Sequence, residues 1–174
     1  MSYGFFLVRL PAGVDRDEAY RQKLEEEDRV SDGKPDHVNP GPIDPRKERE
    51  KQRLAAALMA RHPTLELYRR NYPTTARALG IDELEARRRF RHLELNEKQL
   101  SIQITLFDDA AGVSFSFDGD ARGCARAARV LWDCLEILEF EGGFSTYDTQ
   151  IDKILDLKSD FGIVLKQTCG VDEG

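Results

Sequence analysis

Every second side chain is apolar in two neighbouring stretches, residues 100–107 (LSIQITLF) and 113–117 (VSFSF). This period of two is typical of strands with one buried and one polar face. The DDAAG stretch that joins them predicts a hairpin, and HLELN at residues 92–96 shows the same period. We therefore predict three antiparallel strands in a meander.

The N-terminal stretch predicts a different kind of strand. Residues 3–10 form a nearly continuous apolar run that ends at Pro11 and Gly13, which is the pattern of a strand covered on both faces and therefore inside the sheet. No basic region precedes this run, and Arg9 interrupts it. We therefore do not interpret it as a signal peptide.

Helix signals mark two longer segments and one short segment between residues 44 and 89. The first starts at Asp44, an N-cap residue followed by proline, and stops at Pro63. The stretch after Pro63 is irregular apart from a short helix after Thr74. A capping-box-like start at Asp82 predicts the second helix, which runs through Arg89.

The longest helical pattern covers residues 120–141, with apolar side chains at spacings of three and four and charged side chains opposite them. Two glycines end it. Residues 144–148 (FSTYD) predict a further strand, and residues 151–157 and 161–167 predict a short helical or extended finish.

These elements predict a single α+β domain over residues 1–174. Its antiparallel sheet consists of the meander plus the N-terminal strand, and its helices pack mainly on one face. Residues 15–27 are acidic and helix-permissive, whereas prolines and glycines predict a flexible loop at about 28–45.

Charge is distributed unevenly along the chain. The net charge is −6, but residues 46–92 carry 13 basic and 6 acidic side chains, and residues 93–174 carry 7 and 16. The basic block contains RRNYPTTAR and EARRRFRH, a composition typical of nucleic-acid surfaces. We favour glutamate–arginine pairing on solvated helix faces, because phosphate repels a chain of this net charge. No apolar run is long enough to span a bilayer, so we expect no membrane contact.

The sequence contains none of the short motifs that mark a catalytic mechanism, and its three histidines lie far apart. We therefore expect no enzyme activity, no cofactor and no metal. Cys124, Cys134 and Cys169 are odd in number and lack a CxxC pairing. They predict a reduced, cytoplasmic protein.

Three carboxylates fall in the last turns of the predicted helix at 120–141, namely those of Glu136, Glu139 and Glu141. The helix dipole disfavours an anion there by roughly some tenths of a kcal/mol. A local rule that is broken without local compensation marks a place where function can lie. Solvent-facing carboxylates that cost little are the alternative explanation.

The stretch GGFSTYDTQ, residues 142–150, follows directly. In an ideal strand Asp148 shares a face with Phe144, and Tyr147 points the other way. A buried Asp148 would need hydrogen bonds from the amides of the following turn or from an arginine, and the binding role would pass to Tyr147. If the strand ends earlier, Asp148 joins the helix carboxylates at the surface.

The opening MSYGFFLVRLP, the central RFRHLELNEKQLSIQITLFDDAAGVSFSF and the closing EGGFSTYDTQIDKILDL resemble a group of small, poorly characterised bacterial proteins. These begin near MSYD and carry a YDPQ tetrad near the C-terminus. Gly4 stands where that pattern has an acid, and Thr149 stands where it has a proline. Such proteins resemble the immunity partners that bacteria keep beside secreted antibacterial toxins, which implies a non-catalytic role.

The sequence thus predicts an immunity protein that neutralises a toxin domain by occluding its active site through an acidic surface. Toxins that act on nucleic acids or nucleotides tend to have basic clefts, which an acidic partner complements. The predicted partner-binding residues are Glu136, Glu139, Glu141, Tyr147 and Asp148. The alternative is a nucleic-acid-associated regulator, or an enzyme without a visible motif, that uses the arginine-rich segment 69–91.

Overall fold

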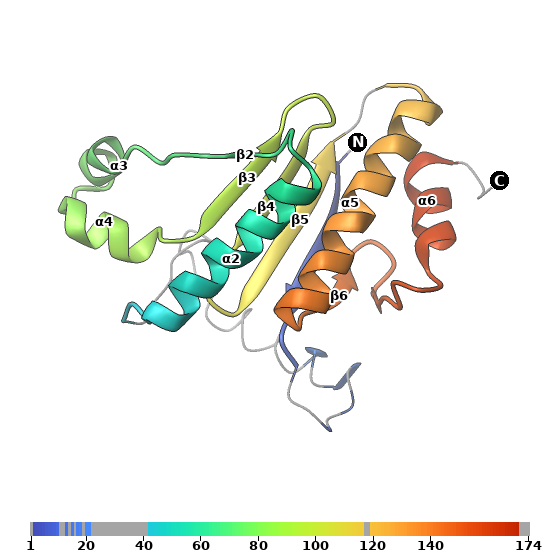
Figure 1. The fold of residues 1–174 in the computed structure, drawn as a ribbon, viewed down its shortest axis with the longest axis horizontal. Coiled ribbons are helices and arrows are strands. Elements are labelled where there is room, and N and C mark those ends of the chain that lie inside the picture. Colours follow the sequence, from blue (N-terminus) through green and yellow to red (C-terminus); the bar gives the residue numbers. More distant parts are fainter. Residues whose placement is uncertain are drawn as a thin grey trace.

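The computed structural model describes residues 2–10, 13, 15, 17–18, 20–21, 42–116 and 119–170, which form one antiparallel sheet and five helices (Figure 1). The sheet has the strand order β2-β3-β4-β5-β1-β6-β7. Its strands are β1 (Ser2–Val8), β2 (Glu66–Leu67), β3 (Leu93–Glu97), β4 (Ile102–Leu106), β5 (Ala110–Ser116), β6 (Ser145–Asp148) and β7 (Lys153–Ile154). The helices are α2 (Pro45–Arg61), α3 (Tyr72–Leu79), α4 (Glu83–Arg89), α5 (Ala121–Gly142) and α6 (Phe161–Cys169). The predicted α+β class is confirmed.

Strand β1 lies inside the sheet, between β5 and β6, as its apolar run predicts. Leu7 and Val8 point to opposite faces because they are adjacent in a strand, yet both are 0% exposed. The predicted meander is β3–β4–β5, in which Ile104 pairs with Val113 and both are buried. The sheet is therefore buried at its centre, around β1 and β5.

Helices α2 and α5 lie side by side over one face of the sheet, and α6 packs on α5 (Figure 1). Asp44 caps α2 by accepting from the backbone N of Arg46 at 2.8 Å, and proline occupies the first turn, as predicted. Helix α5 ends at Gly143, whose φ of 66° is the left-handed conformation that glycine adopts at low cost. The apolar stripe of α5 forms the main core with the sheet.

A smaller apolar cluster covers the opposite face of the sheet near β1 and β6. It contains Val8, Tyr20 and Tyr147, with Phe6 and Ile154 partly buried against it. Since β6 is covered on both faces here, all four of its residues are buried.

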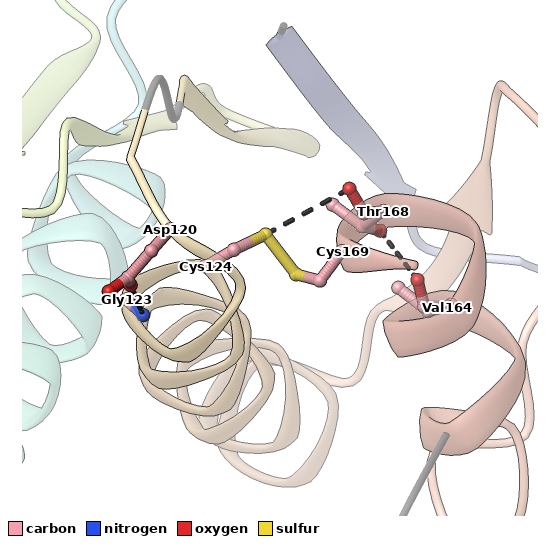
Figure 2. Close-up of a disulfide and its surroundings, with 6 residues drawn as sticks. All are labelled: Asp120, Gly123, Cys124, Val164, Thr168 and Cys169. Carbon is pink, nitrogen blue, oxygen red and sulfur yellow. Dashed lines mark hydrogen bonds between the residues drawn. A yellow bond between two sulfur atoms is a disulfide. The ribbon is translucent and has the colours of Figure 1, made fainter. Parts of the chain in front are cut away.

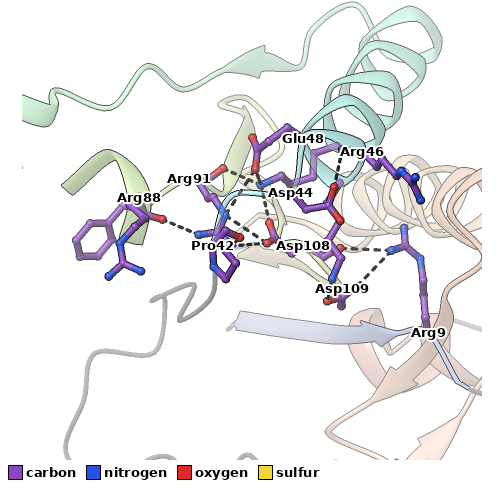
Figure 3. Close-up of polar contacts among 12 residues, drawn as sticks. Arg9, Pro42, Asp44, Arg46, Glu48, Arg88, Arg91, Asp108 and Asp109 are labelled. Atoms are coloured by element: carbon purple, nitrogen blue, oxygen red, sulfur yellow. Dashed lines mark hydrogen bonds and ion pairs between the residues drawn. The ribbon is translucent and has the colours of Figure 1, made fainter. Parts of the chain in front are cut away.

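A charged network is buried where α2 meets the start of β3 and the β4–β5 hairpin (Figure 3). Asp108 accepts from Lys51 Nζ at 2.9 Å and from Arg91 Nη2 at 2.5 Å. The side chains of Lys51 and Arg91 are only 3% and 6% exposed. Glu48 lies 2.7 Å from Lys51 Nζ, so two cations face two carboxylates.

A disulfide joins Cys124, in the first turn of α5, to Cys169 at the end of α6 (Figure 2). The prediction of reduced cysteines is wrong for this pair. The two residues are 45 positions apart, and they meet because α6 folds back along α5. The predicted cytoplasmic location rested on reduced thiols, and the disulfide removes that support, since disulfides persist mainly in oxidising compartments. Cys134 is free, and its burial raises the pKa of its thiol to about 12.

The structure differs from the sequence prediction in two short elements. The sequence does not predict strand β2, because two residues are too few to show a period. Helix α3 begins at Tyr72, just before the expected Thr74. The predicted loop at about 28–45 lies outside the described residues up to residue 41, as does most of the helix-permissive stretch at 15–27. Among the helices that the structure describes, none is long and apolar enough to cross a bilayer.

Candidate functional site

The C-terminal turn of α5 is compensated by arginines from other elements. Arg53 of α2 donates to the carbonyl oxygen of Glu141 at 2.7 Å and binds the Glu141 carboxylate at 2.6 Å. Arg9, directly after β1, donates to the carbonyl oxygen of Gly142 at 2.8 Å. These cations are what the negative end of a helix dipole favours. The acidic helix end is therefore explained by tertiary contacts and is not in itself a sign of function.

The predicted glutamates have three different environments. Glu141 is held by Arg53, and Glu139 accepts from the backbone N of Thr146 at 3.0 Å, which ties α5 to β6. Glu136 is exposed and has no ion-pair partner among the residues that the structure describes. Only Glu136 thus presents an uncompensated carboxylate.

Asp148 is buried and has a structural role. This is the first of the two alternatives that the strand pattern left open. It is 0% exposed. Its carboxylate accepts from the backbone N of Gln150 at 2.9 Å and of Ile151 at 3.3 Å, as expected for the following turn. The third donor is the hydroxyl of Tyr3 at 2.6 Å, in place of an arginine. A partner cannot reach this carboxylate in the folded protein, so the prediction of Asp148 as a contact residue is corrected.

Tyr147 is also buried, although it points to the opposite face from Asp148 as predicted. It is 8% exposed, and its ring stacks on that of Tyr20 with the centroids 3.8 Å apart. The pKa of Tyr147 is raised to about 12. Burial is the larger cause, and the hydrogen bond that the hydroxyl donates to Asp152 is the next. The smaller apolar cluster, which contains Val8 and Tyr20, covers this ring. The strand pattern alone could not show this. Tyr147 therefore does not form the predicted contact surface.

Replacing Asp148 with asparagine should lower the free energy of unfolding by about 1–3 kcal/mol, because one buried hydrogen-bond partner is lost. Chemical denaturation measures this loss. Glu136→Gln is the matched control, since Glu136 is exposed and unpaired in the described chain, and it should change stability by less than about 0.5 kcal/mol. Equal effects of the two substitutions would mean that the buried hydrogen bonds of Asp148 do not stabilise the fold.

Sequence reasoning missed the largest exposed aromatic at this end of α5. Phe140 is 92% exposed. It follows Glu136 by one helical turn, so these two side chains lie on the same face of α5. The sequence could have indicated that Phe140 is exposed, because Phe140 lies outside the apolar stripe of α5. We call Glu136 and Phe140 the α5 end surface.

The arginine-rich segment divides into paired and unpaired residues. Arg87 binds Glu83 at 2.6 Å, and Arg88 and Arg89 both bind Glu85, which confirms the predicted glutamate–arginine pairing for these residues. Hydrogen bonds from Arg88, which has the larger effect, and from Arg89 lower the pKa of Glu85 to about 2. Arg69 and Arg70 make no such ion pair within the described residues.

Within the described ranges no group of three or more histidine, cysteine, aspartate or glutamate side chains is placed to hold a metal ion. Comparison of the chain with protein-family models, curated proteins and solved structures found no match.

Proposed function

We propose that the chain is a non-catalytic binding protein of the immunity type, which captures a basic bacterial toxin domain through the α5 end surface. The observation that carries this proposal is the exposure of Phe140, 92%, beside the exposed carboxylate of Glu136. The sequence resemblance to immunity-like bacterial proteins supports the same class.

Phe140 has the properties of an interface anchor. Burying a phenylalanine side chain contributes about 1.5–3 kcal/mol, and aromatic residues are enriched in the cores of protein interfaces. In the free protein this side chain contributes almost none of its burial to the fold. A partner that covers it gains the full amount.

The Glu136 carboxylate beside Phe140 fits a basic partner. Residues 93–174 carry 7 basic and 16 acidic side chains, so this part of the chain attracts cationic surfaces. Such charges at an interface rim mainly raise the association rate and select the partner. Because Arg9 and Arg53 hold the end of α5, the surface needs little reorganisation on binding.

The test uses the protein as bait in a lysate of its native organism, with identification of the retained protein and measurement of its Kd by biolayer interferometry. Phe140→Ala should weaken binding by about 30-fold or more, the value of a hot-spot residue. Leu84→Ala is the control, since Leu84 is 77% exposed but lies on α4. An unchanged Kd for Phe140→Ala, or an acidic partner, would contradict the proposal.

A further inference from the structure

A cleft of about 530 Å³ lies at the β2–β3 edge of the sheet, away from the α5 end surface. The connection from β2 to α3, the first turn of α3, helix α4 and the start of β3 form its walls. In Figure 1, α3 and α4 extend beyond this edge of the sheet. The residues of the cleft that matter for its chemistry are Tyr68, Arg69, Arg70, Tyr72, His92 and Glu94.

Two arginines of the cleft carry charge that the described part of the chain does not neutralise. Arg69 is exposed and Arg70 is half-buried, and neither has a carboxylate within ion-pair distance among the described residues. The third arginine of the cleft lining, Arg87, is paired with Glu83, and the one acid of the lining is Glu94. The Glu94 carboxylate is already engaged by the side-chain amide of Asn96 at 2.9 Å.

His92 orients Arg70 without cancelling its charge. Arg70 Nη2 lies 2.8 Å from His92 Nε2. A guanidinium can only donate, so Nε2 must be the acceptor and carries no proton. The same guanidinium lies 5.4 Å from the centre of the Phe90 ring. Arg70 is thus held in place with its positive charge available to an anion.

The cleft also offers an exposed aromatic ring on a fixed backbone. Tyr68 is 51% exposed, and its backbone N donates to the carbonyl oxygen of Glu94 at 2.8 Å. The second tyrosine is more constrained, because Tyr72 donates to the carbonyl oxygen of Phe90 at 3.2 Å and carries the Arg87 guanidinium 4.6 Å from its ring centre. The Tyr68 ring is therefore the surface on which a planar group can stack.

We propose that this cleft binds a nucleotide, either free or within single-stranded nucleic acid, with its phosphate on Arg69 and Arg70 and its base on Tyr68. Guanidinium groups pair with phosphate through parallel hydrogen bonds. Bases stack on aromatic side chains without regard to sequence, but only when they are unpaired. This site is independent of the α5 end surface, and the two proposals stand or fall separately.

The test measures binding of AMP by calorimetry and of a short labelled single-stranded RNA by fluorescence anisotropy, both at low salt. The double variant Arg69→Gln/Arg70→Gln should weaken binding about tenfold or more, because both phosphate contacts are lost. The matched control is Arg126→Gln/Arg129→Gln, which makes the same charge change at exposed positions of α5. Its affinity should equal that of the wild type within about twofold.

The stacking contact is tested by a second pair of variants. Tyr68→Ala should weaken binding about fivefold or more, whereas Tyr68→Phe keeps the ring and should retain affinity. These variants alter an exposed side chain, so they decide the question even if the double arginine variant does not fold. Binding of AMP identifies a free nucleotide as sufficient, and binding of the RNA alone identifies the polymer. The proposal is overturned if neither probe binds, or if the cleft variants and the control bind equally.

Discussion

Replacing Leu135 with alanine is expected to lower the free energy of unfolding by about 2–5 kcal/mol. Leu135 is 0% exposed and belongs to the main core that α5 forms with the sheet and α2. The substitution removes the methine carbon and both methyl groups of the leucine, and it leaves a cavity that close-packed neighbours only partly fill. Chemical denaturation monitored by circular dichroism measures the loss.

The adjacent residue provides the control. Glu136→Ala changes an exposed side chain on the same helix, and alanine is the best helix former, so the expected change is within about 0.5 kcal/mol. A loss of less than about 0.5 kcal/mol for Leu135→Ala would show that the stripe of α5 is not the core contact described here.

Replacing Asp108 with asparagine should lower the free energy of unfolding by about 3 kcal/mol. Removing one partner of a buried ion pair typically costs about 3–5 kcal/mol, and the Asp108 side chain is 14% exposed, which favours the lower end. Lys51 and Arg91 would then lose the carboxylate that both of them bind, while Glu48 would stay within ion-pair distance of each. Asp109→Asn is the control, because its side chain is 55% exposed and its ion pair with Lys47 contributes at most about 1 kcal/mol.

The effect of Asp108→Asn should depend on pH. Burial alone would raise the pKa of Asp108, but hydrogen bonds from Arg91 and Lys51 outweigh it and lower the pKa. A lowered pKa in the folded state stabilises the protein above the unfolded value of about 3.9, and this contribution is lost as the pH falls below it. The difference between wild type and variant should be full at pH 7 and should shrink below about pH 4. A constant difference would contradict the ion-pair account.

Elements with a strong period were predictable from the sequence because their burial is regular. The alternation in β4 and the stripe of α5 both place their apolar side chains in the core, and Asp44 and Asp82 cap the helices that follow them. Strand β2 has only two residues, and its pairing depends on β3. Short elements of this kind are set by their neighbours rather than by their own pattern.

The candidate site was less predictable because its residues meet across long sequence distances. The strand pattern placed Tyr147 and Asp148 on opposite faces, but it could not show that a second cluster and the Tyr3 hydroxyl bury both of them. The acidic end of α5 was interpreted without the arginines at positions 9 and 53, which compensate it. Phe140 is also exposed at this helix end, and its place outside the apolar stripe of α5 is visible in the sequence.

The most direct test of the proposed function is the growth of bacteria that express the captured basic partner. The partner should arrest growth when it is expressed alone, and co-expression of this chain should restore growth. Phe140→Ala should fail to restore it, while Leu84→Ala should protect as well as the wild type, since both residues are exposed but only Phe140 lies on the α5 end surface. A partner that is harmless when expressed alone, or full protection by Phe140→Ala at equal protein levels, would contradict the account.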